Sequence, residues 1–273
     1  MSQPRPARPP HRISDIWKAP LHDFPIRDEI LYQYLPLSAE MDVLEVGPGS
    51  GITAFRWASR VRSLTLLDVA QGNIAQLQLA LSHIPNVRFI CADIGKPELP
   101  QILSQRFDAA YAIEVFELVP DPEACLKNLG ALLRPGAHLL LQFPNYPPPK
   151  NPGVTYFAER RDLDRLFRDA GFTTWSVYTL ALRPHAQALY RTFHEGPLRV
   201  YRRLRARPAS NRPLVYDQSW TFQQQHRLES FKPLINAVWL ALSVAMGCGG
   251  ECFTATPTGV DILNRNLLVL ATR

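Results

Sequence analysis

Apolar residues divide the chain into short runs that alternate with helical repeats. The runs are bounded by polar or turn-forming residues, and they predict five buried strands, at residues 43–46, 63–68, 86–93, 107–113 and 137–143. The segments around them space their apolar residues three or four apart, which predicts helices at residues 26–35, 52–58, 71–81, 123–133 and 159–170. Strands and helices in alternation are typical of a parallel sheet with helices on both faces.

The end of the chain departs from this alternation. Residues 173–182 alternate apolar and polar side chains like a strand, and residues 263–273 predict one more strand. About eighty residues separate the two, which is far too long for a hairpin loop. Four parts are therefore expected: an N-terminal tail and cap at residues 1–25, a core at 26–183, an insertion at 184–262 and the final strand of the core sheet at 263–273.

The insertion has a basic first part and an apolar second part. The first part contains a single acid, Glu195. Together with the residue before the insertion, it contains eight arginines: Arg183, Arg191, Arg199, Arg202, Arg203, Arg205, Arg207 and Arg212. Residues 234–246 are almost wholly apolar but fall short of the roughly 20 residues that a membrane span needs. They predict a buried helix in a lid. The alternative is an interfacial helix beside the basic patch, which would suit an anionic or lipid-like acceptor at a membrane surface.

Composition narrows the class of protein and of partner. Among 273 residues, 46% are hydrophobic and 20% charged, which is typical of a globular protein. The net charge of +6 favours an acidic partner, whether phosphate, carboxylate, anionic lipid or nucleic acid. No secretory signal precedes the four cysteines, so a cytoplasmic setting is expected. Cys248 and Cys252 have no second pair or nearby histidine, which favours plain thiols over a metal site.

The first strand ends in the sequence from Glu45 through Gly47, Gly49 and Gly51, directly before a predicted helix. Glycine tolerates positive φ and lets a ligand approach the bare backbone. The helix start adds unpaired N–H groups and the positive end of the helix dipole. Open α/β sheets bind ligands at this edge, the carboxyl ends of the strands. The glycine spacing, G-x-G-x-G, differs from the G-x-G-x-x-G of dinucleotide sites.

Acids stand at three successive strand ends: Glu45, Asp68 and Asp93. In a nucleotide-binding α/β unit, an acid after the second strand accepts hydrogen bonds from ribose hydroxyls. One such acid is common by chance, but three in succession are not. The sequence therefore predicts a site for a nucleoside-containing ligand at this edge of the sheet.

These motifs, together with the segment from Glu114 to Glu117, resemble the class I S-adenosyl-L-methionine (SAM)-dependent methyltransferases. The small-molecule branch related to ubiquinone and menaquinone biosynthesis enzymes is the most similar. The resemblance covers roughly residues 31–182 and the final strand. It implies an α/β fold with a Rossmann-like, seven-stranded, mostly parallel sheet and an inserted, mainly helical lid. It also implies a biosynthetic methyltransferase that converts SAM to S-adenosyl-L-homocysteine.

The resemblance also implies roles for individual residues. Gly47, Gly49 and Gly51 would border the methionine part of SAM, and Glu45 would orient its amino group. The ribose and adenine would be held by Asp68, Val69, Asp93 and Ile94, and the floor near the sulfonium would be formed by Ile113 and Glu114. Residues expected to contact the acceptor are Trp17, His22 and Tyr146.

One departure from the family concerns metal. Some relatives carry Glu-x-x-Glu-His after the fourth strand and bind a divalent ion there, whereas here Leu118 takes the place of the histidine. Leucine cannot coordinate a metal, so a metal-independent enzyme is expected. A base is needed only for an acceptor such as a hydroxyl. The candidates are His22, His185, His194 and His226, and none is assigned.

The leading interpretation is a SAM-dependent methyltransferase of a small-molecule, lipid or glycan acceptor, in possible peripheral contact with a membrane. A dehydrogenase that uses NAD is disfavoured by the glycine spacing and by Glu45. A nucleic-acid methyltransferase would suit the positive charge, but the fourth strand ends in Ala-Ile-Glu-Val rather than an Asn/Asp-Pro-Pro-aromatic motif. A binding protein without turnover is disfavoured by the intact glycines and acids.

Overall fold

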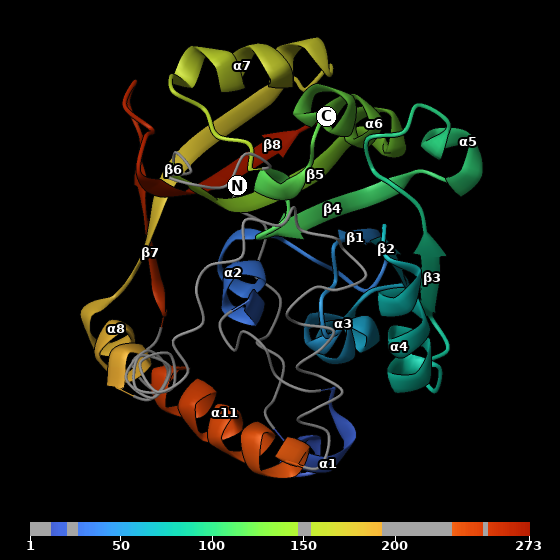
Figure 1. Ribbon diagram of the computed structural model, residues 1–273, viewed down its shortest axis with the longest axis vertical. Helices are drawn as coiled ribbons and strands as arrows, with labels where there is room; N and C mark the ends of the chain where they lie inside the picture. Colours follow the sequence, from blue (N-terminus) through green and yellow to red (C-terminus); the bar gives the residue numbers. More distant parts are fainter. Residues whose placement is uncertain (1–11, 21–26, 147–153, 193–230, 248–250) are drawn as a thin grey trace, which may run out of the picture.

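The computed structural model describes residues 12–20, 27–146, 154–192, 231–247 and 251–273 (Figure 1). Within these ranges one eight-stranded sheet carries helices on both faces. Its strands are β1 (Asp42–Val46), β2 (Ser63–Asp68), β3 (Val87–Cys91), β4 (Phe107–Ile113), β5 (Leu133–Asn145), β6 (Thr174–Leu182), β7 (Phe253–Pro257) and β8 (Arg265–Thr272).

The strand order is β3-β2-β1-β4-β5-β8-β6-β7. The pairs from β3 to β5 are all parallel, whereas β8 runs antiparallel to both of its neighbours, β5 and β6. The strand order reverses at β1, which has β2 on one side and β4 on the other, and such a switch point is where open α/β sheets bind ligands. The predicted α/β architecture with a mostly parallel sheet is thus confirmed.

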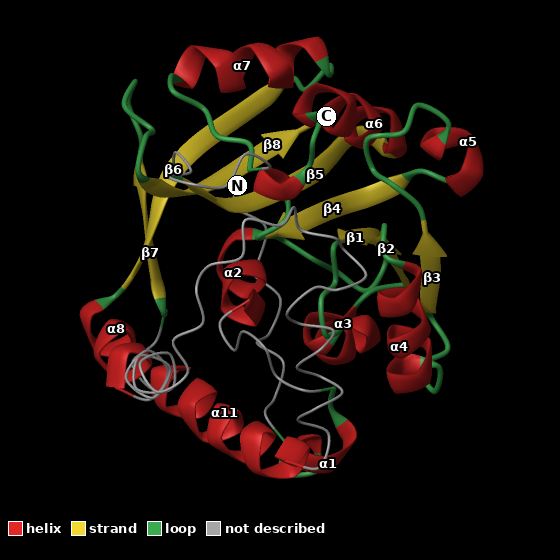
Figure 2. Cartoon of the chain, viewed as in Figure 1, coloured by secondary structure: helices red, strands yellow, loops and turns green. Residues whose placement is uncertain are grey.

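Two groups of helices cover the sheet (Figure 2). On one face lie α2 (Arg27–Tyr34), α3 (Ile52–Trp57) with the short helix η1 (Ala58–Arg60) directly after it, and α4 (Gln71–Leu81). The other face carries α5 (Leu99–Leu103), α6 (Pro122–Leu132) and α7 (Arg160–Asp169), with η2 (Phe116–Leu118) after β4. In α7, Leu163, Leu166 and Phe167 are buried as their spacing predicts, and Gly171 follows its end at a φ of 80°.

The sheet has one strand more than the seven predicted. Strand β7 lies inside the segment expected to be an insertion and pairs antiparallel with β6. Two threonines and a terminal proline give it little apolar pattern, which is why the sequence does not reveal it. Proline is tolerated there because β7 is the edge strand of the sheet.

The remainder of the described insertion is helical. It comprises α8 (Pro184–Tyr190) and α11 (Lys232–Gly247), the latter confirming the predicted apolar helix. Helix α11 packs against α8 and against α1 (Asp15–Lys18), so the insertion contacts the N-terminal part of the chain. The buried side-chain amide of Asn236 donates to the carbonyls of Ala19 and Pro20, at 3.3 Å each. Most of the predicted basic part, residues 193–230, lies outside the described residues.

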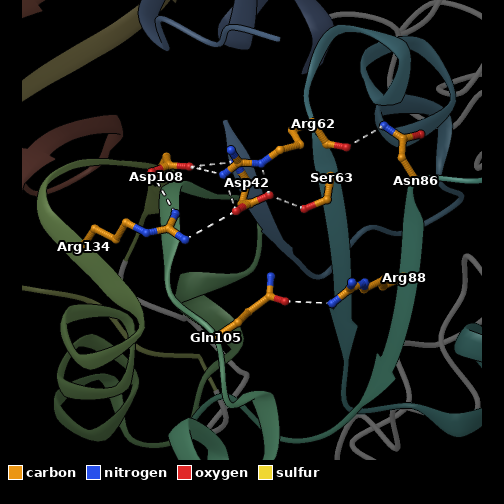
Figure 3. Close-up of polar contacts among 8 residues, drawn as sticks. All are labelled: Asp42, Arg62, Ser63, Asn86, Arg88, Gln105, Asp108 and Arg134. Atoms are coloured by element: carbon orange, nitrogen blue, oxygen red, sulfur yellow. Dashed lines mark hydrogen bonds and ion pairs between the residues drawn. The ribbon is translucent and has the colours of Figure 1, made fainter. Parts of the chain in front are cut away.

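Opposite the carboxyl ends of the strands, an ion network joins the starts of β1 and β4 (Figure 3). The Asp42 carboxylate accepts from Arg62 at 2.5 Å and from the Ser63 hydroxyl at 2.7 Å. Arg134 lies 2.8 Å from Asp108, whose carboxylate also accepts from the Asp42 backbone N–H. The hydrogen bond from Arg62 holds the pKa of Asp42 well below its usual range. Burial has the opposite effect on this pKa, but a smaller one.

We expect Asp42→Asn to lower the free energy of unfolding by about 1 kcal/mol at neutral pH, at the low end for charged hydrogen bonds because Arg62 is half exposed. The folded-state pKa of Asp42 lies below its unfolded-state value. The stabilisation is therefore complete above the unfolded-state pKa and is lost as the pH falls through the folded-state pKa. Urea unfolding at neutral pH and at about pH 3 tests this. If the free energies of unfolding of the parent and of Asp42→Asn differed by the same amount at both pH values, this prediction would be wrong.

Candidate active site

The glycine-rich turn forms the junction between β1 and α3. Gly47, Gly49 and Gly51 have φ angles of 66°, 56° and 82°, in the left-handed region that favours glycine. The Gly47 N–H donates to the Leu67 carbonyl at 2.9 Å, which fixes the turn against β2. A Cβ at Gly47 would collide with the Val115 side chain. The turn therefore brings bare backbone close to the segment that follows β4.

A cavity of about 220 Å³, here called cavity A, opens at the carboxyl ends of β1, β2 and β4. Among the described residues its lining is Arg27, Val46, Gly47, Gly49, Leu67, Asp68, Val69, Ala70, Asn73, Ala92, Asp93, Ile94, Glu114, Val115, Leu118, Val119 and Pro120. The lining combines exposed backbone, the three carboxylates of Asp68, Asp93 and Glu114, and apolar side chains. This mixture suits a ligand with a polar sugar and a flat apolar ring.

Two of the predicted acids face cavity A. The Asp68 carboxylate accepts from the Ala70 N–H at 2.9 Å and from the Asn73 amide at 2.6 Å, while burial raises the Asp68 pKa. The Asp93 carboxylate accepts from the Gly95 N–H at 2.8 Å. Each carboxylate has further lone pairs for a ligand, because two oxygens offer about four acceptor positions.

The structure separates the other predicted residues into two groups. Gly47, Gly49, Val69, Ile94 and Glu114 line cavity A. The described lining does not include Glu45, Gly51 or Ile113.

Glu45 is buried on the face of β1 that α2 covers, close to Tyr111. Burial raises the Tyr111 pKa well above its usual value, and the Glu45 carboxylate adds to the effect. Arg56 from α3 pairs with Asp28 of α2 on the same side of the sheet. Burial raises the pKa of Asp28 to about 6, against the opposing charge of Arg56. The ion pair between Arg56 and Asp28 thus joins α3 to α2.

The residues predicted to contact the acceptor are not brought together. Trp17 in α1 is 61% exposed and Tyr146, after β5, is 45% exposed, and neither lines a described cavity. His22 lies outside the described residues, as do the candidate bases His194 and His226. The ring of His185 lies 3.2 Å from the Met246 carbonyl, between α8 and α11.

The sequence reasoning missed two polar residues of cavity A. Asn73 lies in the first turn of α4 and its side-chain amide donates to the Asp68 carboxylate, and its position five residues after that acid was the available signal. Arg27 reaches the site from α2, and its guanidinium lies 3.9 Å from the Glu114 carboxylate. No local pattern identifies Arg27, since its place depends on how α2 packs over the sheet.

The segment after β4 carries unusual backbone and side chains. Glu114 has a φ of 57°, which is rare outside glycine, and its N–H donates to the Gln142 carbonyl at 2.8 Å. Such backbone conformations cluster at functional sites. Glu117 is 6% exposed, and burial raises its pKa to about 8. The Glu117 carboxyl is therefore mostly protonated at neutral pH.

A second cavity of about 400 Å³, cavity B, lies beside the antiparallel part of the sheet. The described residues that line it are Ile30, Glu114, Gln142, Leu180, Ala181, Leu182, Gln187, Tyr190, Arg191, Phe253 and Asn266. They come from α2, from the ends of β4 and β5, from β6, β7 and β8, and from α8 with the residue after it. Glu114 is the one described residue shared by the two linings.

Within the described residues, no group of three His, Cys, Asp or Glu side chains is arranged to hold a metal. Among the described cysteines, Cys125 is a buried free thiol, Cys91 is exposed and Cys252 is buried, and Cys248 lies outside the described ranges. None of the helices in the described part of the chain is long and apolar enough to cross a membrane.

Comparisons with known proteins agree with this geometry. A methyltransferase-domain family model matches residues 23–177, more than half of the chain. A ubiquinone biosynthesis O-methyltransferase of Coxiella burnetii is 34% identical over 128 residues, covering 44% of this chain and 50% of that protein. The chain thus spans about half the length of the curated relatives it matches.

Two solved structures share the fold. Phosphoethanolamine N-methyltransferase 2 of Haemonchus contortus, in complex with phosphomonomethylethanolamine and S-adenosylhomocysteine, has a TM-score of 0.52 at 12% identity, over 89% of this chain and 51% of that one. The cyclase SpnF has a TM-score of 0.51 at 16% identity, over 90% of this chain and 79% of that one. With the family match over the glycine turn and the strand-end acids, the chain belongs to the methyltransferase domain family, as a class I domain that uses S-adenosyl-L-methionine as methyl donor.

Proposed function

We propose that this domain transfers a methyl group from SAM in cavity A to a small-molecule acceptor in cavity B. The observation that carries the proposal is Glu114, which lines both cavities and stands at the end of β4, where the two ligands would meet. The curated relatives are O-methyltransferases of ubiquinone biosynthesis, which supports a small, non-polymeric acceptor.

The lining of cavity A supports the following roles. Asp68, oriented by Asn73, accepts from the ribose hydroxyls, and Asp93 accepts from the adenine amine. Val69 and Ile94 pack against the adenine ring, and the backbone at Gly47 and Gly49 borders the methionine part. Glu45 and Ile113 would then act from behind this lining, through the backbone they support.

Bound SAM supplies a methyl group on a positively charged sulfonium, which leaves by in-line displacement. The chain contributes alignment, because holding two reactants in the reactive geometry removes much of the entropic cost of the reaction. No general base is assigned.

We propose that the reaction needs no metal. Leu118 lines cavity A where some relatives have a histidine, and its side chain offers no ligand atom.

The described part of the insertion is proposed to act as a lid over the acceptor. Helix α8 contributes Gln187 and Tyr190 to cavity B, and α11 packs against both α8 and α1. The insertion would therefore select the acceptor.

The outer face of α11 supports peripheral contact with an anionic membrane. Leu234, Val238 and Val244 of α11, with Phe231 directly before it, are each at least 44% exposed, and the sequence of the insertion is rich in arginine. Leu234→Asp is expected to reduce co-sedimentation with anionic vesicles several-fold at low salt. Leu79→Asp, at an exposed leucine of α4, is the matched control. If both variants and the parent sediment equally, the proposed membrane contact is wrong and the proposal that the insertion acts as a lid is unaffected.

Calorimetry with S-adenosylhomocysteine and with NADH tests the proposed function. S-adenosylhomocysteine is expected to bind and NADH is not. Transfer of a labelled methyl group from SAM should then be found across a panel of small acceptors without added metal and in the presence of EDTA. Preference for NADH, or methyl transfer only to RNA or DNA, would overturn the proposal.

A further inference from the structure

Helix α2 contributes to the walls of both cavities. Arg27, at the start of the helix, lines cavity A and is the one cation among the described residues of that lining. Ile30, further along the same helix, lines cavity B. Both side chains reach the cavities only while α2 keeps its place against the sheet. The contacts that fix α2 therefore shape both cavities.

A buried ion pair connects α2 to the helix that follows the glycine turn. Asp28, directly after Arg27, pairs with the guanidinium of Arg56 in α3. Arg56 is 7% exposed and Asp28 is 9% exposed. Loss of one partner from a buried pair is strongly destabilising, because the other is left as an uncompensated charge. Since α3 begins directly after Gly51, this pair holds α2 to the glycine turn.

The charges around Asp28 show what Arg56 does for α2. Burial raises the pKa of Asp28 to about 6, the charge of Arg56 opposes this increase, and that of Glu29 adds to it. Asp28 is therefore ionised at pH 8, where it can pair with Arg56. A second carboxylate, that of Asp15 in α1, lies 3.7 Å from the same guanidinium. Helix α1 supplies no residue to the described lining of either cavity, so Asp15 shares Arg56 but not the place of α2.

We propose that Arg56 is a positioning residue of the cofactor site, and that through Asp28 it holds α2, with Arg27, against cavity A. Arg56 itself is not among the described residues that line either cavity. This inference rests on the proposed function, which places SAM in cavity A. With the pair intact, α2 is in place before the ligand binds. Without it, α2 is in place for only part of the time, and the apparent affinity falls by that fraction.

Titration calorimetry with S-adenosylhomocysteine at pH 8 measures this effect. Arg56→Met and Asp28→Asn are each expected to weaken binding about fivefold, which corresponds to α2 being in place about a fifth of the time. The double variant should lose about fivefold rather than the product of the two losses, because both substitutions remove the same pair. It also removes both charges of the pair, so it carries the test if Arg56→Met alone fails to fold.

Two further variants separate positioning from general damage to the fold. In a protein that already carries Arg27→Met, adding Asp28→Asn should change the affinity less than about twofold, because α2 then presents no cation to cavity A. Asp15→Asn is the matched control, since it removes the other carboxylate near Arg56 without changing α2. Its affinity should agree with that of the parent within about twofold.

The possible outcomes distinguish this inference from the proposed function. Parental affinity in both Asp28→Asn and the double variant would overturn the role of Arg56. A loss in Asp15→Asn as large as that in Asp28→Asn would also overturn it, as would a loss from Asp28→Asn that persists in full beside Arg27→Met. If the parent did not bind S-adenosylhomocysteine, the proposed function itself would be wrong.

Discussion

Asp68→Ala is expected to weaken SAM binding at least tenfold. The carboxylate faces cavity A from the end of β2 and is held in place by Ala70 and Asn73. A hydrogen bond to a charged group contributes on the order of 1.5–3 kcal/mol, and each 1.4 kcal/mol is about a factor of ten in affinity. Titration calorimetry with S-adenosylhomocysteine measures the change.

Asp261→Ala is the matched control for this substitution. Asp261 also accepts from the backbone N–H two residues later, that of Leu263, but it is exposed and outside both cavities. Its replacement removes the same kind of local turn contact and should leave the affinity unchanged. A folded Asp68→Ala protein that binds as tightly as the parent would refute the role given to Asp68.

Gly49→Val is expected to abolish SAM binding. Gly49 lines cavity A at a φ of 56°, where a branched side chain is strained and its Cβ would enter the space of the ligand. The same calorimetric titration, with circular dichroism to verify folding, measures the effect.

Gly136→Val separates the cost of backbone strain from the loss of the site. Gly136 has a φ of 81° near the start of β5, and a Cβ there would meet nothing within 4 Å. The substitution should lower the melting temperature without changing the affinity for S-adenosylhomocysteine. If both glycine variants lost affinity equally, strain alone would explain the result and the role of Gly49 would fail.

Local patterns predicted cavity A in large part. A glycine turn, a strand-end acid and the apolar residue after it all act through residues adjacent in sequence, so Gly47, Asp68, Val69 and Asp93 reach the cavity directly. Glu45 does not reach cavity A, because its side chain lies on the opposite face of β1 from the cavity. Periodicity identifies a strand, but the face a residue occupies depends on which helix packs there.

Cavity B could not be predicted in the same way. It draws on β5, β6, β7 and β8, which come together only through the antiparallel pairing of β8. Gln142 appears in the sequence as one polar residue within an apolar strand, with no signal that it faces a cavity. Phe253 lies in a strand with little apolar pattern and is placed by its pairing with Leu182. Contacts between distant segments, rather than local spacing, determine this half of the site.

The central position of β8 has a consequence for synthesis on the ribosome. Strand β8 separates β5 from β6, so β6 and β7 have no place in the sheet until residues 265–272 have left the exit tunnel. The half of the sheet that forms cavity A can pair earlier, from contiguous strand–helix units. The half that forms cavity B can pair only after β8 has been synthesised. A nascent chain would therefore acquire its nucleoside-binding region before its acceptor-binding region, and partly made chains would expose the apolar edge of β5.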